Sequence, residues 1–361
     1  FLVPLLIPRY PLPGILAALV IDAVDQTVFQ QFTSLPLAGY QGYDKALDIY
    51  YLTIAYISTL RNWSNRFAFR VSRCLFYWRL AGVALFELTH LRPLLLLVPN
   101  TFEYFFIFYE AYRLRWDPRQ MTRRIVIGAA ALIWIVIKLP QEWWIHIAQL
   151  DTTDYVKENV FGASLDTPWS EVLAANLWII PLSLAVVVPI VLLLRWLVRR
   201  LPAADRELAL PADAHQPAFS DEQARRALAE EARSIVDAAL FEKIALVSLV
   251  SLIFAQVLPD VQASSLQLAI GLAVIVVINT ALSHWLARRG FGRVTAVQHF
   301  TVMGLVNASL FLVIGLLLPS QGGAISLGSA LFFVLLLTLI VTLFDRYRQV
   351  YLMRFAPDGG W

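Results

Sequence analysis

The chain has 361 residues, of which 59% are hydrophobic and only 15% are charged, and its net charge is +3. This composition excludes an ordinary soluble domain, because about a quarter of the residues in such domains are charged. The arginines lie in clusters directly beside apolar segments, which argues against a nucleic-acid-binding surface. The single cysteine, Cys74, excludes an intrachain disulfide.

Ten apolar segments are long enough to cross a bilayer. A helix needs about 20 apolar residues to span a hydrocarbon core of about 30 Å. The sequence therefore predicts an all-α fold, a polytopic transmembrane helix bundle with about ten spans. We place the spans near residues 12–30, 44–60, 72–90, 93–113, 124–140, 172–196, 241–258, 266–287, 298–318 and 325–345.

Basic residues follow every second span. The loops between these clusters hold almost no basic residues beyond Arg92 and Lys157. Because loops rich in Lys and Arg stay on the cytoplasmic side, an even number of spans with both termini cytoplasmic satisfies every loop. Arginine outnumbers lysine by 25 to 4, which is typical of a bacterial source rich in G and C, so we expect a multi-pass protein of the bacterial inner (plasma) membrane. The clusters occupy residues 61–73, 113–124, 195–200, 288–293 and 346–354.

One substantial polar segment, residues 201–240, divides the chain into two halves of different character. Its prolines predict a flexible start. Ser220 followed by Gln223 predicts a capping box that opens a helix. We therefore expect a cytoplasmic linker and amphipathic helix at 201–240, between a polar six-span half at 1–200 and an apolar four-span half at 241–361.

The C-terminal half carries few polar side chains besides Asn279 and Asn307 within its spans. Small residues such as Gly304 and Gly328 suit close packing between helices. We expect these four spans to form a scaffold in the lipid bilayer, or a surface for a second copy of the chain or for partners in a membrane complex.

Carboxylates lie in or beside the apolar runs of the N-terminal half. Acids at such depths usually face a bundle interior, a cavity or a partner charge. Asp22 and Asp25 are three residues apart, and Asp44 and Asp48 are four apart, so each pair shares a helix face. Four facing carboxylates would bind a hard cation or share protons. The alternative is that they are simply polar helix ends, with Asp44 as an N-cap.

The spacing of these aspartates resembles that of the metal-binding acids of CDP-alcohol phosphotransferases, over fewer than thirty residues. The glycine and the Ala-Arg pair expected after the second acid are Gln26 and Phe29-Gln30 in this chain. The family's acids also lie on the cytoplasmic side, whereas the arginine clusters place these aspartates outside. We therefore assign no family on this spacing.

Two acid–histidine pairs lie near the predicted outer face. Glu87 and His90 are three residues apart, and Glu142 and His146 are four apart. A di-iron site needs two E-x-x-H pairs and two further glutamates, and only one such pair is present. The two histidines would ligate a haem or a metal if they converged, but a buried histidine paired with a carboxylate is the more common arrangement.

The fourth predicted span is interrupted by Pro99 and Asn100, and Glu103 follows one turn later. Proline removes a helical hydrogen bond and frees a carbonyl, which must be satisfied by protein, water or an ion. Broken helices beside an acid are typical of transporter sites. The structural alternative is a packing kink in which Glu103 pairs with Arg79 or Lys138.

Three classes of function are compatible with these residues. Ion-coupled transport or cation and proton conduction would use Asp22, Asp25 and Glu103. A membrane subunit or scaffold of a larger complex would pair the acids with a partner chain. A metal-dependent enzyme acting on a lipid-linked substrate at the outer face would hold its metal between the aspartate pairs. We favour the first class, and no motif identifies a cofactor, a substrate or a catalytic residue.

Overall fold

The computed structural model describes residues 1–32, 40–148, 155–164, 167–216, 219–224, 226–227, 236–257, 265–288, 296–317 and 327–355. Within these ranges the side chains of residues 23–32 and 40–44 lie outside the description, as do those at several other helix ends. The described residues form helices and their connections, with no strand among them. The all-α prediction is therefore confirmed for this part of the chain.

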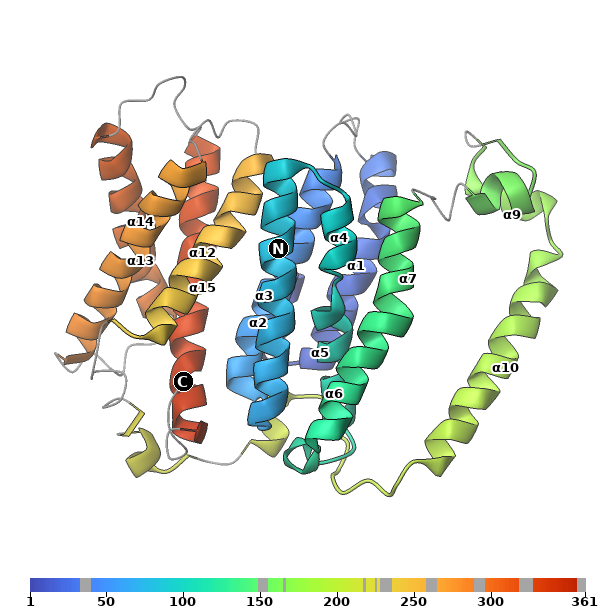
Figure 1. The fold of residues 1–361 in the computed structure, drawn as a ribbon, viewed down its shortest axis with the longest axis horizontal. Coiled ribbons are helices and arrows are strands. Elements are labelled where there is room, and N and C mark those ends of the chain that lie inside the picture. Colours follow the sequence, from blue (N-terminus) through green and yellow to red (C-terminus); the bar gives the residue numbers. More distant parts are fainter. Residues whose placement is uncertain are drawn as a thin grey trace.

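The first half of the chain folds into long helices that lie side by side (Figure 1). A continuous helix at Arg123–Ile147 combines α6, the π-helical η3, α7 and the π-helical η4. The helices are α1 (Pro11–Phe32), α2 (Tyr40–Asn62), α3 (Arg66–Thr89), α4 (Pro93–Leu97), α5 (Thr101–Arg113), α6 (Arg123–Leu132), η3 (Ile133–Lys138), α7 (Leu139–Glu142) and η4 (Trp143–Ile147), with short turns η1 (Val3–Leu6), η2 (Pro118–Gln120) and η5 (Val156–Val160).

The second part of the chain begins with the short helix α9 and the long helix α10. Helices α12 to α15 then pack against one another, and α12 and α15 also pack against the first bundle. Helix α2 packs against α1, α3, α12 and α15, so it occupies the centre of the fold. Between Ile49 and Leu60 every side chain of α2 is buried. These helices are α9 (Trp169–Ala175), α10 (Ile179–Arg200), α12 (Ala238–Val257), α13 (Ser265–Arg288), α14 (Ala296–Leu317) and α15 (Leu327–Phe355), with the short turn η6 (Ala212–His215) before α12.

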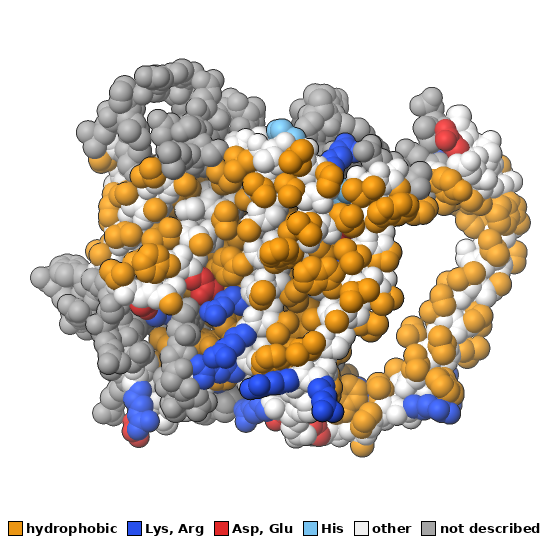
Figure 2. Space-filling model, in the orientation of Figure 1, with side chains coloured by type: hydrophobic (Ala, Val, Ile, Leu, Met, Phe, Trp, Pro, Cys, Tyr) orange, Lys and Arg blue, Asp and Glu red, His pale blue; other side chains and the backbone are white. Residues whose placement is uncertain are grey.

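Each of the ten predicted spans falls largely on a helix. Four stretches of the described chain are long and apolar enough to cross a membrane, which indicates a membrane protein. Figure 2 shows apolar side chains over the middle of the visible face and Lys and Arg side chains mainly along its lower edge. The four stretches are Arg123–Ile147, Ile179–Arg200, Ala238–Gln256 and Ala330–Phe355.

Helix α10 stands apart from the bundle (Figure 1). None of its 22 residues is buried, and apolar side chains cover its whole circumference. A helix that is apolar on every side needs an apolar environment on every side. Lipid or another protein chain must therefore surround it.

Local sequence signals explain several helix boundaries. The side chain of Asn65 accepts a hydrogen bond from the Ala68 N–H at 3.0 Å and caps the start of α3. Ser220 and Gln223 exchange hydrogen bonds of 2.9 and 3.2 Å, which confirms the predicted capping box. The π-helical turn η3 lies directly before Leu139 and Pro140, and Pro140 cannot donate the next helical hydrogen bond.

Helices α3 and α4 approach each other closely where Gly82 of α3 meets Val98, the residue before Pro99 at the predicted break. A β-carbon at Gly82 would overlap the side chain of Val98, the residue that ends α4. The absence of a side chain at position 82 therefore allows the broken segment to lie directly on α3. This contact brings Val98 and Pro99 to the level of Arg79, one turn earlier on α3.

Candidate functional site

Eight polar side chains meet inside the N-terminal helices, and we refer to them as the charge network. They come from α2, α3, the break between α4 and α5, the start of α5, and the helix at Arg123–Ile147. All are buried or partly buried. The charge network consists of Asp48, Tyr51, Arg79, Asn100, Glu103, Lys138, Glu142 and His146.

The predicted helix break is confirmed and forms one side of the network. Helix α4 ends at Leu97 and α5 begins at Thr101, so the carbonyls of the last turn of α4 are left without helical partners. The Arg79 guanidinium donates to the Val98 carbonyl at 3.1 Å, and the Trp78 indole N–H donates to the Leu97 carbonyl at 3.1 Å. Side chains of α3 thus supply donors to two carbonyls that lose their helical partners where the helix breaks.

Glu103 lies at the centre of the network and is only 3% exposed. The Tyr51 hydroxyl donates to its Oε1 at 2.6 Å, and the Asn100 amide donates to its Oε2 at 3.0 Å. The Lys138 ammonium lies 3.6 Å from the same Oε2 and 3.9 Å from the centre of the Tyr104 ring. The carboxylate is therefore held by one phenol, one amide and one cation.

Glu142 and Asp48 flank Glu103 and share Arg79. The guanidinium lies 3.7 Å from Glu142 Oε1 and 3.6 Å from Asp48 Oδ2. Glu142 also accepts the Asn100 backbone N–H at 3.1 Å and pairs with His146 Nε2 at 3.0 Å. The Asn100 amide reaches Asp48 Oδ1 at 3.5 Å, so this one residue contacts all three acids.

Acids outnumber the strong bases of the network among the described residues. Three carboxylates lie beside two basic side chains, Arg79 and Lys138, and His146 is a third base when it is protonated. With all three acids ionised and His146 neutral, one negative charge is left, which protonation of His146 or of one acid would neutralise, or which a monovalent cation would balance. Burying an uncompensated charge is costly, so the network is suited to taking up and releasing one positive charge.

The structure joins some of the predicted site residues and separates others. Asp48, Glu103, Glu142 and His146 belong to the network, and Asp22 is close enough to Tyr51 for an electrostatic interaction. The side chains of Asp25 and Asp44 lie outside the described residues, so their convergence with Asp22 stays a prediction. Within the described part of the chain, no three His, Cys, Asp or Glu side chains form a group with metal-ligand geometry.

Glu87 and His90 do not join the network. Glu87 is buried on α3, within electrostatic reach of Lys45 and His90, and one of its oxygens lacks a hydrogen bond. His90 is exposed and ends α3 in the left-handed backbone conformation, with φ of 55°. It therefore forms the C-cap of α3.

Sequence reasoning did not identify Tyr51 as part of the site. Its position offered a signal, because Tyr51 follows Asp48 by three residues and shares its helix face. The sequence predicts either Arg79 or Lys138 as the ion-pair partner of Glu103 if the break is a packing kink. In the structure Lys138 pairs with Glu103, whereas Arg79 pairs with Asp48 and Glu142.

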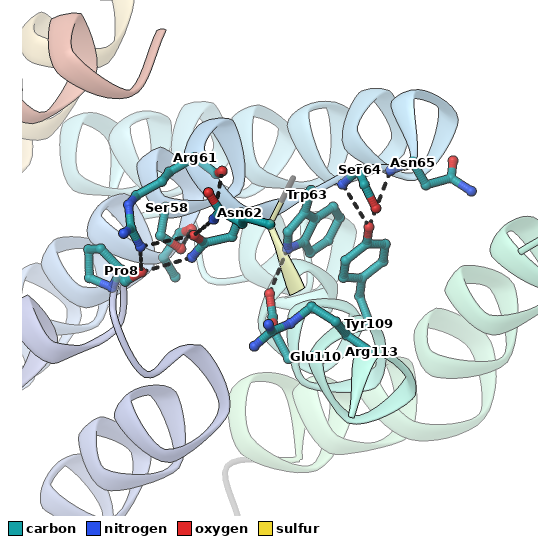
Figure 3. Close-up of polar contacts among 12 residues, drawn as sticks. Pro8, Ser58, Arg61, Asn62, Trp63, Ser64, Asn65, Tyr109, Glu110 and Arg113 are labelled. Carbon is teal, nitrogen blue, oxygen red and sulfur yellow. Dashed lines mark hydrogen bonds and ion pairs between the residues drawn. The ribbon is translucent and has the colours of Figure 1, made fainter. Parts of the chain in front are cut away.

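A second polar cluster, also missed from the sequence, lies at the turn between α2 and α3 (Figure 3). The Trp63 indole donates to Glu110 Oε1 at 2.8 Å, and Arg113 Nε donates to Glu110 Oε2 at 2.6 Å. The Tyr109 hydroxyl accepts the backbone N–H groups of Ser64 and Asn65 at 3.2 and 3.3 Å. These bonds satisfy a buried turn and tie it to the C-terminal end of α5.

The described residues thus define a helical membrane protein with a largely buried network of charged side chains beside a broken helix. Comparisons with protein-family models, with curated proteins and with solved structures found no match. The function proposed below therefore rests on the chain's own residues.

Proposed function

We propose that the protein moves protons or a monovalent cation across the membrane, in conduction or in ion-coupled transport, with Glu103 as the group that takes up the charge. The observation that carries this proposal is the number of acids: three carboxylates lie beside two basic side chains, Arg79 and Lys138, in one buried cluster. Ionisable groups inside a membrane bundle typically mark such pathways. The broken helix and the π-helical turn beside Lys138 are also frequent at functional sites.

We further infer that all ten predicted spans cross the membrane, with the arginine-rich loops and the C-terminus on the cytoplasmic side. Phe1 itself lies midway along the bundle, where its carbonyl accepts the Tyr50 hydroxyl at 2.9 Å (Figure 1). The gathering of Lys and Arg along one edge in Figure 2 supports this orientation. In that orientation the α2–α3 turn, which lies between Arg61 and Arg66 of one basic cluster, is on the cytoplasmic side. The arrangement is typical of a multi-pass protein of a bacterial inner membrane.

The test is flux through proteoliposomes that contain the purified chain. A potassium diffusion potential drives proton entry, which a pH-sensitive dye in the lumen reports. A parallel series imposes a sodium gradient instead and measures sodium entry. We expect Glu103→Gln to reduce flux to the level of empty vesicles, because the amide cannot ionise. Asp48 and Glu142 remain in this variant, so loss of flux identifies Glu103 as the group that accepts the charge.

The chain offers a matched control in Glu242. Its carboxylate also accepts a hydrogen bond from a buried tyrosine, Tyr56, and lies 3.6 Å from a cation, Arg73. Glu242→Gln therefore makes the same chemical change in a similar environment outside the network, and we expect it to retain flux. Wild-type flux in folded Glu103→Gln protein would falsify the proposal.

A second candidate, a membrane subunit of a larger assembly, is supported by α10. None of its residues is buried although it is apolar throughout, so a partner's helices would fit against it. The sequence also offered the C-terminal helices as a contact surface for partners or a second copy. Purification in mild detergent with mass spectrometry is expected to recover a stoichiometric partner under this candidate, and a lone chain with flux activity would contradict it.

The third class of function from the sequence is a metal-dependent enzyme that acts on a lipid-linked substrate at the outer face. It requires Asp25 and Asp44 to face Asp22 and Asp48, and the side chains of the first two lie outside the described residues. No geometric observation favours it over transport.

A further inference from the structure

A hollow lined by basic side chains lies at the end of the bundle that carries the α2–α3 turn. The segment after α10 closes it from one side. The Asp205 N–H donates to the Arg115 carbonyl at 3.1 Å, and the Ala212 N–H donates to the Arg9 carbonyl at 2.8 Å. The hollow is partly open to solvent, so a small anion can reach the side chains that line it from outside the bundle.

Four arginines line the hollow, and the described residues that line it include no acid. Arg113 comes from α5, Arg119 from η2, Arg206 from the segment after α10, and Arg354 from the end of α15. His215 and Gln216 add neutral or weakly basic groups. Segments far apart in the sequence thus bring positive charge to one place.

Two of these arginines form ion pairs with acids that do not line the hollow. Arg113 Nε donates to Glu110 at 2.6 Å, and Arg206 Nη2 lies 2.6 Å from Asp117. These ion pairs hold both side chains in place, since a guanidinium that bonds a carboxylate through one edge retains donors on the other. Indeed, Arg113 Nη2 is buried and has no hydrogen-bond partner.

The other two arginines supply uncompensated positive charge. Arg354 donates only to carbonyls, those of Trp63 and Arg61, and its Nε is also buried without a partner. Arg119 and Arg354 lie close enough to repel each other electrostatically. Within the part of the chain that the structure describes, neither forms an ion pair with a carboxylate. An anion between them would remove this repulsion.

We propose that this hollow binds a phosphate group, either of a soluble ligand or of a lipid headgroup. Arginine presents several N–H donors in a fixed fork and binds phosphate oxygens through two parallel bonds. Arg113, Arg119 and Arg354 line the hollow from three elements, and an anion with several oxygens can accept hydrogen bonds from more than one of them. The inference does not depend on the transport proposed above, because it concerns different residues.

The experiment compares two probes on the full-length purified chain in detergent. Inorganic phosphate is titrated against chloride at equal ionic strength, and phosphatidylglycerol is titrated against the net-neutral phosphatidylcholine. Binding raises the midpoint of thermal unfolding, which gives an apparent affinity for each probe. Stabilisation by inorganic phosphate identifies a soluble phosphate ligand, and stabilisation by phosphatidylglycerol alone identifies a lipid headgroup.

The decisive variant is Arg119→Gln, with Arg124→Gln as the matched control. Both side chains are exposed, so both proteins should fold, but only Arg119 lines the hollow. We expect Arg119→Gln to weaken binding about tenfold, as the loss of one charge-assisted contact does. Arg119→Glu should abolish binding, and Arg124→Gln should leave it unchanged. The proposal is overturned if neither probe binds, or if the two glutamine variants bind alike.

Discussion

Replacement of Arg79 by methionine is expected to destabilise the protein by about 3–5 kcal/mol, as measured by thermal or denaturant unfolding in detergent. The methionine fills much of the same space but removes the cation that lies between Asp48 and Glu142, at 3.6 and 3.7 Å. It also leaves the Val98 carbonyl at the helix break without its donor. The Arg79 side chain is only 8% exposed, so water replaces little of what is lost.

Two further variants separate the charge effect from packing. Arg92→Met changes an exposed arginine before α4 and is expected to shift stability by less than about 0.5 kcal/mol. Adding Asp48→Asn to Arg79→Met should recover part of the loss, because one of the two abandoned charges is removed. Equal stability of Arg79→Met and Arg92→Met would show that the network contributes nothing to the fold.

Replacement of Trp63 by alanine is expected to cost about 3–5 kcal/mol of stability. Its side chain is fully buried, with the ring stacked 3.7 Å from the Tyr109 ring centre at an interplanar angle of 16°. Alanine leaves a cavity there and removes the indole N–H that Glu110 accepts. Because this cluster joins the α2–α3 turn to α5, its loss loosens the wall of the basic hollow as well.

Trp63→Phe separates the loss of the indole hydrogen bond to Glu110 from the loss of apolar packing. Phenylalanine keeps most of the apolar contact but lacks the N–H donor, so the expected loss is about 1–3 kcal/mol, the effect of one unsatisfied buried acceptor. Trp196→Ala serves as the control, because that side chain on α10 is 48% exposed in the chain and should tolerate truncation. If Trp63→Ala unfolds at the same midpoint as Trp196→Ala, the turn is not part of the stabilising core.

Local signals in the sequence predicted the helices and some of their ends. The ten apolar stretches fall largely on helices, and four of these helices are long and apolar enough to cross a membrane. Pro99 marked the break between α4 and α5, and Ser220 with Gln223 marked a helix start. These features depend on a few neighbouring residues, so a single sequence is sufficient to find them.

The partners of the charged residues depend on how each helix is rotated and which helix lies beside it. Glu103 and Lys138 are 35 residues apart, and Asp48 and Glu142 meet at Arg79 on a third helix. Glu87 and His90 pair with neither Glu103 nor Arg79 among the described contacts, so their candidacy as ion- or proton-binding residues stays a prediction. Charges far apart in the sequence pair only after packing has brought their helices together.

By itself, the sequence determined the membrane class, the helical architecture and the part of the chain in which polar groups are concentrated. Those properties follow from apolar length, proline and capping residues, which act over one or two helical turns. Only the tertiary structure decided that three carboxylates meet Arg79 and Lys138 in one network, that α10 stands outside the bundle, and that four distant arginines line one hollow. The physical reason is that burial and ion pairing arise from contacts between helices, and such contacts are not encoded in any short segment.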